Sequence, residues 1–204
     1  MTKTCCSNTH DFTGLDRRYK RILWTVIIIN GAMFMIEMFA GHTSSSQALK
    51  SDALDFLADS VTYGLSLAVI GHRFQTRAKA ALFKAISLFV IGGYVLIGTL
   101  YRTFFQIQPE AEIMGIIGFL ALIANLVSVL LLMRYKDGDS NVRSVWLCSR
   151  HDAVGNIAVM IASLAVFWLH SPWPDLIVAF LMSGLFVHSA QLILRQSLNE
   201  LAQK

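Results

Sequence analysis

The chain has 204 residues, of which 55% are hydrophobic and 15% are charged, and its formal net charge is +4. Soluble domains carry about 25% charged residues, so this composition excludes an ordinary soluble globular protein and predicts an integral membrane protein in contact with the lipid bilayer. The net charge is small, and no basic patch with interleaved aromatic residues occurs, which argues against a nucleic-acid partner. Three cysteines, two of them adjacent, provide no disulfide framework.

Residues 1–18 are mostly polar and are expected to form a flexible cytoplasmic tail. They contain Cys5, Cys6 and His10, and thiolate and imidazole groups are ligands for soft metal ions. Two interpretations stand: an unstructured terminus with incidental cysteines, or a tail that captures metal in the cytoplasm.

Six apolar segments follow between residues 19 and 196, and they predict an all-α bundle of six transmembrane helices. Each has about 20 residues, which at 1.5 Å per residue crosses a hydrocarbon core of about 30 Å. The segments lie near 21–41, 49–71, 80–101, 113–133, 145–169 and 176–194. Residues 197–204 are expected to be a short cytoplasmic tail with no further domain.

Lys and Arg residues predict the orientation of the bundle. They are concentrated in the N-terminal tail, in the loops after the second and fourth segments, and at the C-terminus. The opposite loops hold only Lys50 and Arg102, while Arg150 lies inside the fifth segment. By the positive-inside rule, both termini are cytoplasmic.

The second segment carries three carboxylates, Asp52, Asp55 and Asp59, at positions i, i+3 and i+7. This spacing puts them on one helical face. An ionisable group at bilayer depth costs several kcal/mol, so three on one stripe indicate a function. A divalent cation neutralises carboxylates that would otherwise repel each other or take up protons. Asp52, near the outer interface, is either a helix N-terminal carboxylate or a ligand on the exit path.

The fifth segment carries a second cluster. Cys148 and Asp152 are four residues apart and share a face, and His151 borders it. Counted from the two helix ends, Asp59 and Asp152 both fall near the middle of the membrane. Asp55, Asp59, Cys148 and Asp152 would give zinc its usual four ligands, with His151 as the alternative to Cys148.

At these residues the chain resembles the cation diffusion facilitator family. The second-segment pair Asp55-Phe56-Leu57-Ala58-Asp59 and the element Asp152-Ala153-Val154-Gly155-Asn156 match the family's motifs, and Glu37 and Gly41 fit its first helix. The resemblance implies a homodimer that exchanges a divalent metal, most often zinc, for protons. Cys148 departs from the family's usual histidine, and a thiolate favours zinc or cadmium. The family's usual cytoplasmic domain is also missing, so the dimer is expected to form through the membrane helices.

The sequence therefore predicts a secondary transporter in a bacterial inner membrane, with a transported divalent cation and no permanently bound cofactor. Closely spaced carboxylates cannot all stay ionised once a metal leaves, so metal loss and proton uptake become one event. An intramembrane metalloenzyme is disfavoured because no His-Glu-x-x-His or serine–histidine arrangement occurs. A passive channel, a metal sensor, and a transporter of iron, cobalt or nickel remain as alternatives.

Overall fold

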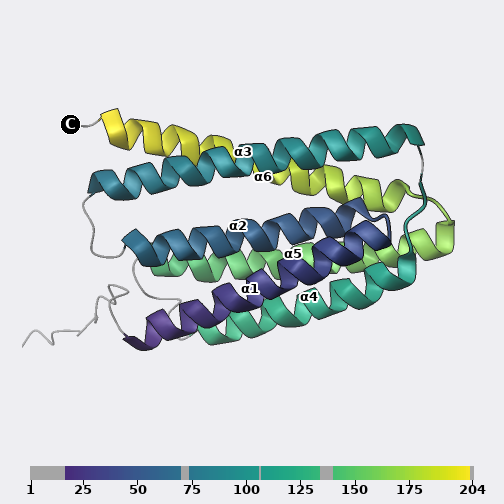
Figure 1. Cartoon of the computed structure of the whole chain (residues 1–204), viewed down its shortest axis with the longest axis horizontal. Helices are drawn as coiled ribbons and strands as arrows, with labels where there is room; N and C mark the ends of the chain where they lie inside the picture. Colours follow the sequence, from purple (N-terminus) through teal and green to yellow (C-terminus); the bar gives the residue numbers. More distant parts are fainter. Residues whose placement is uncertain (1–16, 70–73, 106, 134–139, 203–204) are drawn as a thin grey trace, which may run out of the picture.

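The computed structural model describes residues 17–69, 74–105, 107–133 and 140–202, and Figure 1 shows their arrangement. In these ranges the chain forms helices and contains no strand. The helices are α1 (Arg17–Thr43), α2 (Gln47–Val69), α3 (Phe74–Phe105), α4 (Ala111–Leu132), α5 (Ser140–Leu169) and α6 (Trp173–Ala202). The expected six-helix, all-α bundle is therefore confirmed.

The helices extend beyond the apolar segments that predict them. α3 begins at Phe74 rather than near residue 80, and α6 continues to Ala202, so most of the tail expected at 197–204 is helical. At the other end, α1 begins at Arg17, inside the expected N-terminal tail. Hydropathy identifies only the part of a helix that lies in hydrocarbon. Arg, Lys, Gln and Leu are good helix formers, and they carry the helices further into the polar region.

The bundle is built around α2. The most extensive packing is between α3 and α6, between α1 and α2, and between α4 and α5, while α2 contacts all five other helices. Figure 1 shows α3 and α6 lying together along one side of α1, α2, α4 and α5. Among the described residues, five helices are long and apolar enough to cross a membrane. The exception is α2, which is more polar because it carries Lys50 and three aspartates. The other five helices pack around it.

Gly92 brings α3 and α6 into close contact. A Cβ atom at Gly92 would lie 3.1 Å from Phe186 Cβ and 3.1 Å from Val187 Cγ2, closer than most side-chain contacts. Ser183 Oγ of α6 donates a hydrogen bond of 2.9 Å to the Gly92 carbonyl oxygen. This glycine therefore serves packing within the chain, as small residues do at helix interfaces in membranes.

The first turn of α2 is held by a carboxylate from α6. Asp175 accepts hydrogen bonds from Ser46 Oγ at 2.6 Å, from the Gln47 amide at 2.8 Å and from the Ala48 amide at 3.0 Å. The carboxylate is 2% exposed. It satisfies amides that have no partner inside the helix, and its negative charge lies at the positive end of the helix dipole. This contact joins α2 to the α3–α6 pair.

Replacing Asp175 by Ala is expected to lower the free energy of unfolding by about 2–4 kcal/mol, because three buried donors lose a charged acceptor. Chemical denaturation of the purified protein in detergent micelles measures the change. Asp175→Asn keeps one oxygen acceptor and should lose about half as much. A loss of less than about 1 kcal/mol in Asp175→Ala would show that water replaces the carboxylate at little cost.

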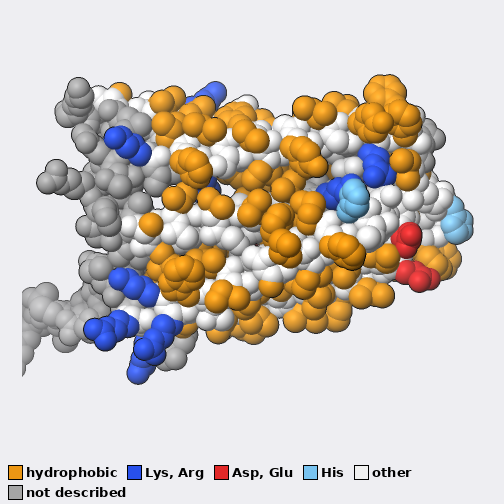
Figure 2. Space-filling model, viewed as in Figure 1, with side chains coloured by type: hydrophobic (Ala, Val, Ile, Leu, Met, Phe, Trp, Pro, Cys, Tyr) orange, Lys and Arg blue, Asp and Glu red, His pale blue; other side chains and the backbone are white. Residues whose placement is uncertain are grey.

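The two described termini, Arg17 and Ala202, lie at the same end of the bundle, which we call the terminal end; the opposite end is the far end (Figure 1). In Figure 2, apolar side chains cover the length of the visible face, and Lys and Arg side chains lie toward its two ends. Large apolar side chains such as Phe39, Ile97 and Phe104 are exposed. An apolar surface of this extent requires lipid around it, so the chain is a multi-pass integral membrane protein.

Candidate functional site

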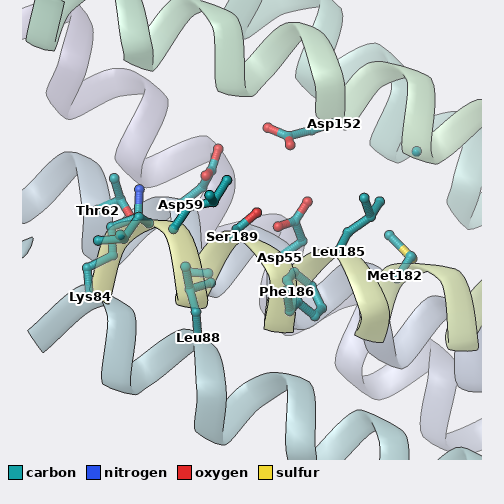
Figure 3. Close-up of a pocket in the computed structure, with 14 residues that line it drawn as sticks. Asp55, Asp59, Thr62, Lys84, Leu88, Asp152, Met182, Leu185, Phe186 and Ser189 are labelled. Atoms are coloured by element: carbon teal, nitrogen blue, oxygen red, sulfur yellow. The ribbon is translucent and has the colours of Figure 1, made fainter. Parts of the chain in front are cut away.

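A partly open cavity of about 520 Å³ lies among α2, α3, α5 and α6 (Figure 3). Asp55 and Asp59 of α2 line it, and Asp152 of α5 faces the same space. Lys84 of α3 also lines the cavity, and apolar side chains of α6, including Met182, Leu185 and Phe186, form much of the remaining wall. Carboxylates of the second and fifth predicted segments therefore line one cavity.

The geometry of two helices brings the carboxylates together. Asp55 and Asp59 are one turn apart on α2, so they follow the same face. Asp152 of α5 lines the same cavity as both. Tyr63, one turn beyond Asp59 and fully buried, donates a hydrogen bond from its hydroxyl group to Asp59 Oδ2. Tyr63 thereby fixes the orientation of one of the cavity carboxylates.

The carboxylates surround the cavity without forming a finished coordination sphere. Among the described residues, no three His, Cys, Asp or Glu side chains are placed so that they could hold one metal ion. Asp55, Asp59 and Asp152 therefore line one cavity without being placed as the ligands of a single ion.

Asp52 lies deeper in the bundle than expected from its place near the helix start. It is 1% exposed, and its carboxyl faces Glu37 of α1, which is fully buried. Asp52 and Asn125 of α4 join the three cavity aspartates around a small enclosed space that has no room for a water molecule. Asp52 is thus next to the site on its far-end side, and its role as a ligand on the exit path stays a prediction.

Part of the cavity wall lies toward the terminal end, where Thr62, Lys84 and Leu192 line it. A narrow space bordered by Asp52 and Asn125 adjoins the carboxylates. The contact of Asp175 with α2, and a hydrogen bond of 3.4 Å from Arg102 Nη1 to the Ser45 carbonyl oxygen, hold the helices together at the far end.

Several predicted site residues cannot be placed. The α5 backbone puts Cys148 one helical turn before Asp152, with His151 beside it, but the side chains of Cys148 and His151 lie outside the described residues. The tail residues Cys5, Cys6 and His10 also lie outside the described part of the chain.

Two residues near the carboxylates were not assigned to the site from the sequence. Lys84 is one of them, and it lines the cavity. Asn125 is the other: it is an amide in the apolar middle of α4 and is 2% exposed. An isolated polar residue within an apolar stretch of a membrane helix is the signal that could have identified both.

A cavity lined by aspartates inside a six-helix membrane bundle defines a membrane protein with an intramembrane acidic site. The family described as cation efflux transmembrane domain matches residues 23–202. The chain therefore belongs to this family, which confirms the resemblance to cation diffusion facilitators.

Curated relatives show the same similarity. The metal cation efflux system protein CzcD of Cupriavidus metallidurans is 27% identical over 96% of this chain and 65% of its own length. The zinc transporter ZitB of Escherichia coli is 29% identical over 97% of this chain and 67% of its own length. A cadmium, cobalt and zinc/H(+)-K(+) antiporter of Bacillus subtilis is 24% identical over 90% and 63%. The chain spans about two thirds of the length of these relatives, and their bacterial sources agree with an inner-membrane location.

Proposed function

We propose that this protein exports a divalent metal cation, most favourably zinc, in exchange for protons. The observation that carries the proposal is the meeting of Asp55 and Asp59 of α2 with Asp152 of α5 around one intramembrane cavity. Oxygen ligands alone suit many divalent ions, and the names of the relatives, which include zinc, cadmium and cobalt, favour transition metals.

The fourth ligand comes from the turn of α5 that precedes Asp152. A helical backbone over Ser140–Leu169 carries Cys148 on the face of Asp152, and His151 borders that face. Either residue would add a fourth ligand to Asp55, Asp59 and Asp152 and so give the tetrahedral coordination that zinc prefers. Cys148 favours zinc or cadmium over iron, cobalt or nickel, the alternative cargoes.

Protons take the place of the metal. Three aspartates that approach each other closely cannot all stay charged without a cation, because like charges in a poorly solvated site repel strongly. Metal arrival then displaces protons, and metal departure allows them to return. Antiport follows if the site opens alternately to the two sides of the membrane.

Contacts at the far end support a state that faces the terminal end. Asp175 and Arg102 join helices at the far end, and Thr62 and Lys84 line the cavity nearer the terminal end. With the termini in the cytoplasm, as the positive-inside rule predicts, this is the state that loads metal from the cell. Both the orientation and a homodimer formed through the membrane helices stay predictions.

Expression in a bacterial strain that lacks its own zinc exporters tests the function. Cells loaded with radioactive zinc should lose it faster when they produce this protein, and they should grow at higher zinc concentrations. A passive channel would let zinc in under the same conditions and would make the cells more sensitive. A metal sensor would leave the zinc content unchanged.

Cys148→Ser is expected to weaken cadmium binding by about a hundredfold and manganese binding by less than about threefold, because a thiolate is the preferred ligand of soft ions. Isothermal titration of the purified variant with each metal measures the two affinities. Equal losses for both metals would point to a structural role. Unchanged affinities would assign the fourth position to His151.

A further inference from the structure

A lysine side chain, that of Lys84, lines the cavity together with the carboxylates. Figure 3 shows the Lys84 side chain reaching from α3 toward Thr62 and Asp59 of α2. Among the described residues that line this cavity, Lys84 is the one with a positive charge, beside Asp55, Asp59 and Asp152.

Packing of α3 directs Lys84 to this place. Lys84 and Leu88 are one turn apart, share a helical face and both line the cavity. The neighbouring Ala85 is fully buried, so this face of α3 is turned to the protein rather than to lipid. A lysine inside an apolar span costs free energy that nearby carboxylates can recover.

We infer that Lys84 is an internal counter-ion of the metal site, whose ammonium group balances the carboxylates before the cargo binds and is displaced by the incoming metal. This inference rests on the proposed function, because it assigns Lys84 a role toward the same cargo. An ammonium group suits this role. It is a compact charge on a flexible stem, and it donates hydrogen bonds without acting as a metal ligand while it is charged.

The position of Lys84 adds a second consequence. It lines the cavity in the part of α3 near the terminal end, so a cation that enters from that end passes close to the ammonium group. The repulsion between the two charges lowers the affinity of the site for the metal. A lower affinity favours release, and a transporter must release its cargo to turn over. Lys84 therefore lowers the affinity of the site for the metal and keeps metal release, and with it transport, fast.

Zinc titration of the full chain in lipid nanodiscs tests the inference. Lys84→Met keeps the length and apolar stem of the side chain and removes the charge, and Lys84→Arg keeps the charge. Lys79→Met is the matched control, since Lys79 is exposed on the same helix and is not among the residues lining the cavity. We expect Lys84→Met to lower the dissociation constant for zinc about tenfold, with Lys84→Arg and Lys79→Met within about twofold of the wild type.

Transport kinetics supply a second readout. Lys84→Met should lower both KM and kcat for zinc, because the metal binds more tightly and leaves more slowly. An unchanged or weaker affinity in Lys84→Met would overturn the inference and return Lys84 to a packing role. An equal gain in Lys79→Met would overturn it too, since the effect would then be a general one of surface charge. A wild-type protein that binds no zinc would contradict the proposed function itself.

Discussion

Asp59→Asn should reduce zinc transport to the background rate, a loss of about a hundredfold or more. The change removes the negative charge of a proposed metal ligand that is 8% exposed, while the size of the side chain stays the same. The amide oxygen can still accept the hydrogen bond from Tyr63, so the packing between these two residues of α2 is kept. Zinc uptake into proteoliposomes measures the rate.

The control for Asp59→Asn is Glu112→Gln. Glu112 is an exposed carboxylate in the first turn of α4, at the far end, and it is not among the residues lining this cavity. Its loss should leave the rate within about twofold of the wild type. Undiminished zinc flux in Asp59→Asn, at normal protein level, would remove Asp59 from the site and with it the assignment of α2 as the metal-binding helix.

Asp152→Asn is expected to have a similarly large effect on transport, and it tests a different element. Asp152 is the described carboxylate that α5 contributes, and it lines one cavity with Asp55 and Asp59. Without its charge, α2 alone supplies anionic ligands among the described residues, and the dication loses an interaction across the helix interface. Zinc affinity should fall about a hundredfold, as measured by titration.

Together the two variants distinguish one shared site from two separate ones. If Asp59 and Asp152 hold the same ion, the double variant should bind zinc hardly more weakly than either single variant, because each alone already destroys the site. Independent sites would give losses that add, with one binding event surviving in each single variant. Full zinc binding in Asp152→Asn would show that α5 has no part in the site.

The acidic residues of the site were predictable from the sequence, because a carboxylate in an apolar segment stands out against its surroundings. Asp55, Asp59 and Asp152 were found by that contrast and by helical spacing. Their convergence was not certain, since the relative depth of α2 and α5 depends on how side chains of α4, α5 and α6 pack around α2. The spacing of residues within one segment does not determine how that segment packs against distant ones.

Lys84 and Asp175 show where sequence analysis fails for a membrane helix. In a soluble helix an apolar stripe reveals which face is inside, but lipid is as apolar as a protein core, so the apolar pattern of α3 does not show that Lys84 faces the protein. The cap on α2 comes from Asp175, 128 positions after Gln47 in the chain. A carboxylate so far away in sequence has no local signal that links it to the helix it stabilises.

The most direct measurement is zinc uptake into proteoliposomes that hold the wild-type protein, a zinc-sensitive dye and an acidic interior. Proton-for-metal exchange predicts that zinc accumulates above its outside concentration while protons leave. An ionophore that collapses the pH gradient, or the change Asp59→Asn, should then stop the accumulation. Zinc entry that is indifferent to the pH gradient would indicate a channel and contradict the antiport mechanism. No flux of zinc, cadmium, iron or manganese would contradict transport altogether.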